Sequence, residues 1–198
     1  MATFQEKLAQ ICWDEYARFE NGVRTETQDP QYKYVGEYWA SIGINYDGRT
    51  KVKNIRPAWS SAFVSFAVRK AGAGARFKYT QAHCHYVDQA MKKADGEGAA
   101  NYGYIARKPG AYAPKVGDIL VAGREYAKRY DYDQAKLVYR ADSFYPSHGD
   151  IVVKVNANSV ETIGGNVSVD TVGRRVRAIG ANGRLTSSPW IAVLECVL

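Results

Sequence analysis

The stretch PAWSSAFVSFAVRKAG at residues 57–72 contains the clearest helix of the chain. Apolar side chains recur along it at i, i+3, i+4, i+7 and i+8, namely at Trp59, Ala62, Phe63, Phe66 and Ala67. Pro57 precedes this apolar stripe and Gly72 follows it, which is typical of a helix start and stop. The spacing therefore predicts a helix over residues 58–71.

Further helices and a group of strands are predicted on either side of this helix. Helices are expected at residues 3–20, where Thr3 and Glu6 form a capping box, at 31–43, and from Thr80 to Lys93. Strands are expected at 116–122, 148–155, 159–165 and 190–197. Because helices come first and strands follow, the order favours an α+β fold with an antiparallel sheet.

The length and composition indicate one globular domain. The chain has 198 residues, of which 46% are hydrophobic and 24% charged. We expect residues 1–198 to form a single domain, with an N-terminal helical extension at 1–56 and a core at 57–198. A Tyr-rich insertion at 124–145 interrupts the core and shows no clear pattern.

The charge and the cysteines exclude some classes of function. The net charge is +7, but the basic residues are scattered, so we expect no specific nucleic-acid binding. The three cysteines are far apart and odd in number, which argues against a disulfide framework and against zinc spacing. We therefore expect no cofactor and no metal.

The N-terminal residues do not resemble a targeting segment. Residues 1–19 are amphipathic and charged and have no apolar core of a signal peptide. No apolar run approaches the roughly 18 residues that a transmembrane helix needs. The expectation is a protein that is synthesised in the cytoplasm without a classical signal peptide or a transmembrane segment.

A predicted hairpin brings an imidazole beside a carboxamide. The strands at 148–155 and 159–165 are joined by Asn-Ala-Asn, and a turn centred there pairs Val153 with Glu161 and His148 with Asn166. Directly opposed residues lie on the same face of the sheet. Asn166 is thus expected to orient His148, and one ring nitrogen of His148 would remain free as a base.

The helix over residues 58–71 offers a nucleophile to that base. Ser60 and Ser61 lie in its first turn, where free N–H groups and the positive end of the helix dipole favour an anion. We expect Ser60 to be the nucleophile and Ser61 to be its neighbouring alternative. Taken alone, Ser60 is better explained as a helix cap than as a nucleophile, and its order with His148 and Asn166 favours the catalytic interpretation.

Four segments, in this order, resemble the CHAP amidases of the papain-like NlpC/CHAP superfamily. They are PAWSSAFVSF at 57–66, VGDILV at 116–121, SHGDIVV at 147–153 and IGGNVS at 163–168. The chain is most similar to an uncharacterised bacterial branch, a domain of unknown function, which also carries VGEYW (residues 35–39) and the pattern AHxxY (residues 82–86). The resemblance implies a papain-like fold in which Ser60, His148 and Asn166 are catalytic.

The chain departs from the resembled family at the nucleophile. The family has Cys at the position of Ser60, and a thiol ionises far more readily than a hydroxyl. Three explanations stand: a native Ser-His-Asn centre, a pseudoenzyme that has kept only binding, or an engineered Cys-to-Ser form of a cysteine hydrolase.

Several other side chains are candidates for a supporting role. Asp150 follows His148 by two residues on the same strand face and is a candidate to orient it or to bind substrate. His83 and His85 are candidates for substrate contacts. Tyr86 and Trp59 are candidates for the same role, although the core or the wall of the cleft is the favoured place for them. A metal site at His83-Cys84-His85 is not expected, because adjacent helical residues point about 100° apart.

By this resemblance, the chain is expected to be an amide hydrolase directed at peptidoglycan fragments or peptides. It would be an amidase or endopeptidase, and either a delivered antibacterial effector or a phage-type lysin. As an effector it would be exported to the periplasm or cell wall, with an immunity or delivery protein as partner. The alternative is a catalytically inactive binding module of the same fold.

Overall fold

The computed structural model describes residues 2–141, 143–186 and 189–198. In this part of the chain it contains five α-helices, six strands and two short 3₁₀ helices. The helices are α1 (Phe4–Arg18), α2 (Gln31–Ala40), α3 (Ser60–Ala71), α4 (His83–Ala94) and α5 (Tyr132–Arg140). The strands are β1 (Tyr104–Arg107), β2 (Ile119–Gly123), β3 (Ser147–Val155), β4 (Ser159–Val167), β5 (Thr171–Ala178) and β6 (Ala192–Cys196).

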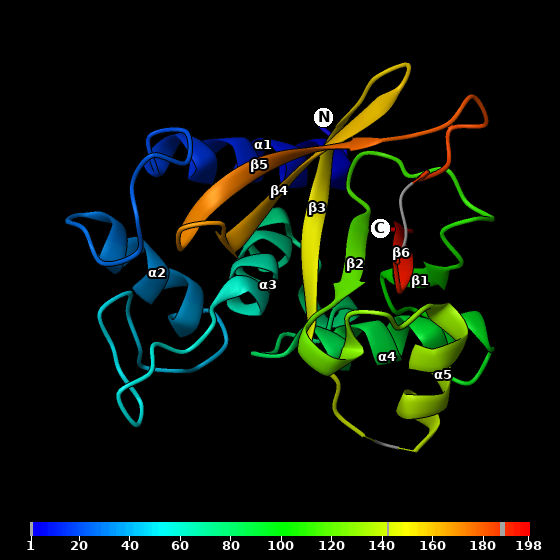
Figure 1. Cartoon of the computed structure of the whole chain (residues 1–198), viewed down its shortest axis with the longest axis horizontal. Helices are drawn as coiled ribbons and strands as arrows, with labels where there is room; N and C mark the ends of the chain where they lie inside the picture. Colours follow the sequence, from blue (N-terminus) through cyan, green and yellow to red (C-terminus); the bar gives the residue numbers. More distant parts are fainter. Residues whose placement is uncertain (1, 142, 187–188) are drawn as a thin grey trace.

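The six strands form one antiparallel sheet in the order β1-β6-β2-β3-β4-β5. Figure 1 shows β3 passing through the middle of the molecule, with α2 and α5 toward opposite sides. The α+β fold with an antiparallel sheet is therefore confirmed. β1 and β5 lie at the two edges of the sheet, and neither is among the predicted strands.

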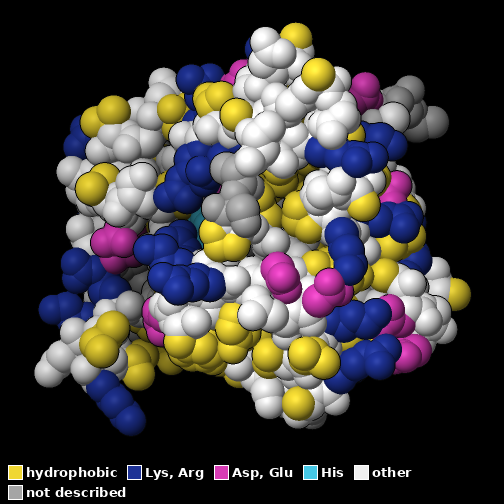
Figure 2. Space-filling view, turned by 45° about the vertical axis from the view of Figure 1, so that its right-hand side comes forward, with side chains coloured by type: hydrophobic (Ala, Val, Ile, Leu, Met, Phe, Trp, Pro, Cys, Tyr) yellow, Lys and Arg dark blue, Asp and Glu magenta, His cyan; other side chains and the backbone are white. Residues whose placement is uncertain are grey.

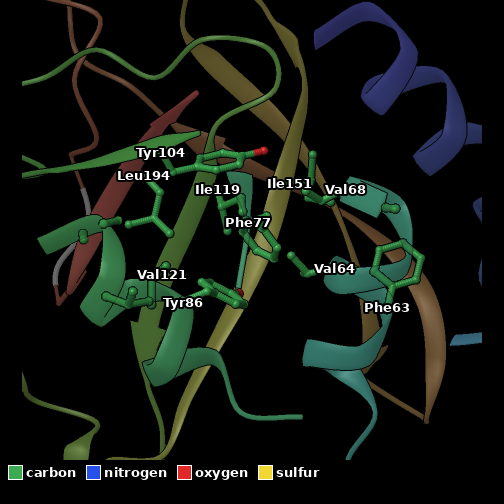
Figure 3. Packing of buried hydrophobic residues seen from close by; sticks show 14 of the residues in the cluster. Phe63, Val64, Val68, Phe77, Tyr86, Tyr104, Ile119, Val121, Ile151 and Leu194 are labelled. Atoms are coloured by element: carbon green, nitrogen blue, oxygen red, sulfur yellow. The ribbon is translucent and has the colours of Figure 1, made fainter. Parts of the chain in front are cut away.

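The sheet separates two hydrophobic clusters. Ile119, Val121 and Ile151 belong to the larger cluster, which includes buried side chains of α1 to α4, as Figure 3 shows in part. Leu120 and Val152 alternate with them and belong to a smaller cluster. This alternation follows from the period of two in a strand, so the two faces of the sheet have different surroundings. We call them the helix face and the loop face.

The predicted helices agree with the structure, except at some of their ends. The capping box of Thr3 and Glu6 is confirmed at the start of α1, and Gly72 ends α3 in the left-handed conformation. Thr80 does not cap α4, which begins at His83 with Ala82 as its N-cap. α1 and α2 contribute to the same hydrophobic cluster as α3 and α4.

The β3–β4 hairpin contains a bulge that the predicted register lacks. Ile151 pairs with Ile163, in the predicted register, but Glu161 pairs with Lys154 instead of Val153. One extra residue in β3 shifts the pairing between Val152 and Lys154. The prediction for Val153 is therefore wrong, while the part of the hairpin nearer His148 keeps its predicted register at Ile151.

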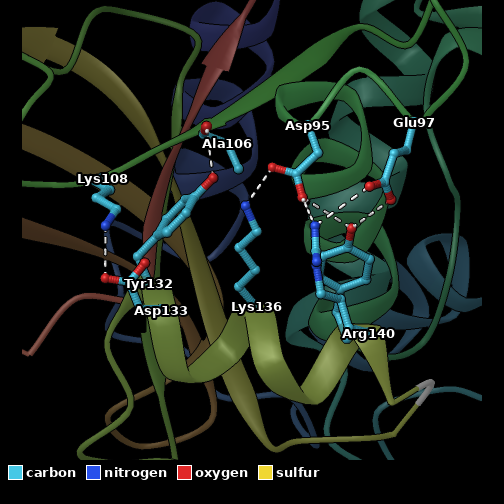
Figure 4. A network of polar contacts seen from close by, with 9 residues as sticks. Asp95, Glu97, Ala106, Lys108, Tyr132, Asp133, Lys136 and Arg140 are labelled. Atoms are coloured by element: carbon cyan, nitrogen blue, oxygen red, sulfur yellow. Dashed lines mark hydrogen bonds and ion pairs between the residues drawn. The ribbon is translucent and has the colours of Figure 1, made fainter.

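The Tyr-rich insertion folds into a 3₁₀ turn (Glu125–Ala127) and α5. α5 is joined to the end of α4 by ion pairs: Asp95 contacts Lys136 at 2.5 Å and Arg140 at 3.0 Å (Figure 4). These contacts hold α5 beside α4. The two ends of the insertion meet beside the start of β3, where the backbone N–H of Arg124 donates to the carbonyl oxygen of Pro146 at 2.9 Å.

Candidate functional site

A pocket of about 440 Å³ lies where the first turns of α3 and α4 meet the start of β3 and the end of β4. We call it the reaction pocket. The insertion supplies part of its wall, through Arg124, Glu125, Phe144 and Tyr145. Its lining includes the three side chains predicted to be catalytic, Ser60, His148 and Asn166, and also His83.

Ser60 is the first residue of α3 and contacts a histidine. Its Oγ lies 2.6 Å from Nε2 of His83, and its side chain is largely buried. The first turn of a helix has N–H groups without intrahelical acceptors, and these can stabilise a developing negative charge. The hydroxyl of Ser61 instead donates to the carbonyl oxygen of Thr80 at 2.8 Å, which gives Ser61 a structural contact.

His83 is held on both of its ring nitrogens. Its Nδ1 forms a short hydrogen bond with the hydroxyl of Tyr86, one helical turn further along α4. Gly149 of β3 packs against this pair, and a Cβ at that position would collide with the Tyr86 hydroxyl. Burial, assisted by the neighbouring His148, lowers the pKa of His83 well below its usual value of 6.5. His83 is therefore neutral at pH 7.

The neutral form of His83 can accept a proton from Ser60. In the tautomer with its proton on Nδ1, His83 donates to the oxygen of Tyr86, and Nε2 is left as an acceptor for the Ser60 hydroxyl. Sequence reasoning placed His83 and Tyr86 among the substrate contacts. In the structure, His83 is the partner of Ser60, and Tyr86 is the partner of His83.

His148 forms a second pair, with a carboxylate. Its Nε2 lies 2.7 Å from Oδ1 of the buried Asp150, and among the described residues no hydrogen bond is found at Nδ1. Burial alone would raise the pKa of Asp150, but His148 and two arginines outweigh it and lower that pKa to about 2. Gly164 of β4 allows the approach, because a Cβ there would overlap Oδ1 of Asp150. Asp150 is therefore an ionised partner that orients His148.

Asn166 does not have its predicted role of orienting His148. The backbone of Asn166 is left-handed, with φ 56°, and its Oδ1 accepts from the N–H of Trp59 at 3.3 Å. Its amide nitrogen donates to Asp170 at 3.0 Å. The irregular pairing of β4 with β5 beyond Gly164 accompanies this conformation. Asn166 therefore connects the end of β4 to the start of α3. Asp150, and not Asn166, orients His148.

Two other candidates, Trp59 and His85, lie outside the reaction pocket. Trp59 is buried in the core, where its Nε1 donates to Glu26 at 2.6 Å, so it is not a substrate contact. His85 is exposed on the other side of α4 from the pocket lining. Burial raises the pKa of the Cys84 thiol and opposes a role as nucleophile. Among the described residues, no group of three or more His, Cys, Asp or Glu could hold a metal ion.

The sequence of residues 9–195 matches the family described as "uncharacterized protein conserved in bacteria (DUF2272)". The chain belongs to this family. The prediction of an uncharacterised bacterial branch is thus confirmed for nearly the whole chain. No curated protein and no solved structure matches the chain. In the described residues of this family member, no helix is long and apolar enough to cross a membrane.

Proposed function

We propose that the chain is an amide hydrolase that uses Ser60 as its nucleophile. The observation that carries this proposal is the 2.6 Å contact between Ser60 Oγ and His83 Nε2, at a pocket that also holds the His148–Asp150 pair. A hydroxyl in contact with a neutral imidazole at a helix start has the components that acyl transfer requires.

In the acylation step, Ser60 Oγ attacks the carbonyl carbon of the amide and its proton moves to Nε2 of His83. The N–H groups of the first turn of α3 stabilise the oxyanion. The carbon–nitrogen bond then breaks, and the imidazolium form of His148, held by Asp150, gives a proton to the leaving nitrogen through Nδ1. The products of this step are the acyl ester of Ser60, a protonated His83 and a neutral His148.

In the deacylation step, a water molecule attacks the ester and its proton moves to the neutral His148. His83 returns its proton to Ser60 Oγ as the ester bond breaks. Both histidines thereby regain their starting states. This division of roles refines the expected centre: His148 remains a proton carrier, while His83 becomes the partner of Ser60.

We further propose a papain-like relationship and peptidoglycan as substrate. The order of the four resembling segments and the position of Ser60 at a helix start beside an antiparallel sheet support this assignment. Peptidoglycan contains amide and peptide bonds that a site of this kind would cleave. A substrate in the wall implies export to the periplasm and, for an antibacterial effector, an immunity partner.

A binding module is the second candidate, and one observation favours it. Complete burial lowers the pKa of His83, which makes its imidazole a weak base, whereas an enzyme gains most from a base matched to its working pH. Under this reading, the reaction pocket holds a wall fragment or a peptide without turnover.

Turnover of purified peptidoglycan distinguishes the two candidates. The native chain should release soluble fragments, and Ser60→Ala should release none, whereas Ser61→Ala should remain active because the Ser61 hydroxyl bonds to a backbone carbonyl. Activity of Ser60→Cys alone would identify an inactivated cysteine hydrolase. Binding of fragments by the native chain without any release would establish the binding module.

A further inference from the structure

A second pocket, of about 300 Å³, opens on the loop face of the sheet. Leu120, which belongs to the smaller cluster, pairs directly with Asp150 across β2 and β3. Val160 of the same cluster pairs with Arg177 of β5. Paired residues share a face of the sheet, so Asp150 and Arg177 both lie on the loop face. We call this the basic pocket.

The basic pocket carries more positive than negative side chains. Its lining includes four cationic residues, Arg124, Lys128, Arg175 and Arg177, and two carboxylates, Asp150 and Glu125. Figure 2 shows Lys and Arg side chains gathered beside a small visible patch of histidine. A hollow with this excess of positive charge attracts an anion.

The carboxylate of Asp150 does not satisfy the two arginines of β5. Arg175 and Arg177 approach its Oδ2 only to 3.9 and 3.8 Å, beyond hydrogen-bond distance. The Nε of Arg177 is buried and has no hydrogen-bond partner among the described residues. A buried donor without an acceptor is uncommon in folded proteins. An oxygen from a ligand would supply the missing acceptor.

The other two cations are also available. Among the described residues, neither Arg124 nor Lys128 forms an ion pair, and both side chains are exposed. Arg177 also lies over the ring of Trp190, at 5.3 Å from its centroid. The aromatic ring helps to fix the position of the Arg177 guanidinium at the wall of the pocket.

The basic pocket adjoins the reaction pocket. Arg124, Glu125 and His148 line both of them. His148 therefore stands between Ser60 on one side and the arginines of β5 on the other. In the proposed mechanism His148 protonates the leaving nitrogen, so the part of the substrate that departs is the part that extends toward the basic pocket.

We propose that the basic pocket binds an anionic oxygen group, a carboxylate or a phosphate, carried by the leaving part of the substrate. Its assignment to the leaving part rests on the proposed function, whereas the anion site itself does not. The substrate class is then an amide whose amine portion bears an acid, such as a peptide cleaved before a residue with a free carboxylate.

The anion site is tested by calorimetric titration of the Ser60→Ala chain, which binds without turnover. Inorganic phosphate and N-acetylglycine are the two probes, at constant ionic strength. We expect Arg177→Gln and Arg175→Gln to weaken binding of the preferred probe by about 10- to 100-fold, in line with loss of a charge-assisted hydrogen bond. Arg174→Gln is the matched control, since its exposed side chain on the same strand contacts Glu161 away from the pocket.

The outcome of the titration identifies the ligand chemistry. If phosphate binds more tightly than N-acetylglycine, the site is assigned to a phosphate group, and in the opposite case to a carboxylate. Either assignment requires that Arg175→Gln and Arg177→Gln weaken the binding. Lys128→Gln, which alters only an exposed side chain, should weaken binding several-fold and guards against misfolding of the arginine variants. If neither probe binds, or if all variants bind the probes equally well, the proposed anion site is wrong.

Activity then tests the assignment to the leaving part. The native chain should cleave a peptide with a free carboxylate on the leaving residue at least tenfold faster, in kcat/KM, than the same peptide as its carboxamide. Arg175→Gln should remove this preference. If neither peptide is cleaved although the anions bind, the proposed function fails and the anion site stands. If both are cleaved equally, the assignment to the leaving part is wrong.

Discussion

The rings of His83 and His148 lie with their centroids 5.4 Å apart, yet each has a different partner. His83 is bonded to two hydroxyl groups, those of Ser60 and Tyr86, whereas His148 is bonded to the carboxylate of Asp150. A carboxylate stabilises a protonated imidazole and hydroxyl groups do so much less. The two histidines are therefore suited to opposite directions of proton transfer.

This division of roles predicts a dependence on the leaving group. His148→Gln should slow the hydrolysis of an amide by about 10²- to 10⁴-fold, the usual contribution of a general acid. It should affect an activated ester such as a p-nitrophenyl ester much less, because that leaving group needs no proton. The measurement is kcat/KM for both substrates.

His83→Gln provides the contrast. It should slow the amide and the ester alike, since both require removal of the Ser60 proton. If the His148→Gln and His83→Gln variants had the same ratio of ester to amide activity, the separate roles of the two histidines would be contradicted.

The burial of His83 predicts how stability depends on pH. Its pKa is lowered in the folded state, so the unfolded chain binds a proton that the folded chain does not. The contribution of neutral His83 to stability is complete above about pH 6.5 and is lost as the pH falls below that value, by at most about 1.4 kcal/mol per pH unit. Urea unfolding of the native chain and of His83→Gln between pH 7.5 and 5 should show a flatter dependence for the variant. His85→Gln, at an exposed position, should leave the slope unchanged.

The burial of the cysteines predicts how fast each thiol reacts with an alkylating agent. Burial raises the pKa of Cys12, Cys84 and Cys196, so the native chain should react slowly with iodoacetamide at pH 7.5. Ser60→Cys should add one fast thiol, because position 60 lies at a helix start in an open pocket and contacts His83. The label is located by peptide mass mapping. Labelling of Cys84 at a similar rate would show that the α4 thiol is more accessible than its burial indicates.

Position 164 should be sensitive to substitution, although Gly164 has no side chain that could take part in catalysis. The Cβ of Gly164→Ala would overlap Oδ1 of Asp150 and lie 3.5 Å from Nε2 of His148. We expect loss of at least 100-fold in amide hydrolysis and about 2 kcal/mol of stability, from the strain of the added methyl group. Gly110→Ala is the control, because nothing lies within 4 Å of its Cβ. Normal activity of Gly164→Ala would show that the His148–Asp150 distance is not critical.

The helices and the central hairpin could be predicted because their signals are local. The apolar stripe of α3 and the turn before Ser159 depend on residues close together in the sequence. β5 was missed because it lies at the edge of the sheet, where its half-buried positions include the charged Arg175 and Arg177 and the apolar Val176 is exposed. β1 has only four residues, and it forms through its pairing with the distant β6.

The site could be predicted only in part, for a different physical reason. Ser60, His148 and Asn166 do line one pocket, as their order in the sequence indicates. The contact of Ser60 with His83 depends on how α3 and α4 pack against each other. The residue pattern within either helix does not predict that packing. The positive φ of Asn166, in turn, directs a predicted orienting group toward Trp59.

The position of His148 near the start of β3 also restricts the shape of what the protein can hold. The reaction pocket begins at helices on one face of the sheet, and the basic pocket lies on the other face. A molecule that occupies both must curve around the tip of a strand. Short flexible chains with rotatable bonds between amide and acid can make that turn, and rigid fused-ring compounds of the same charge cannot.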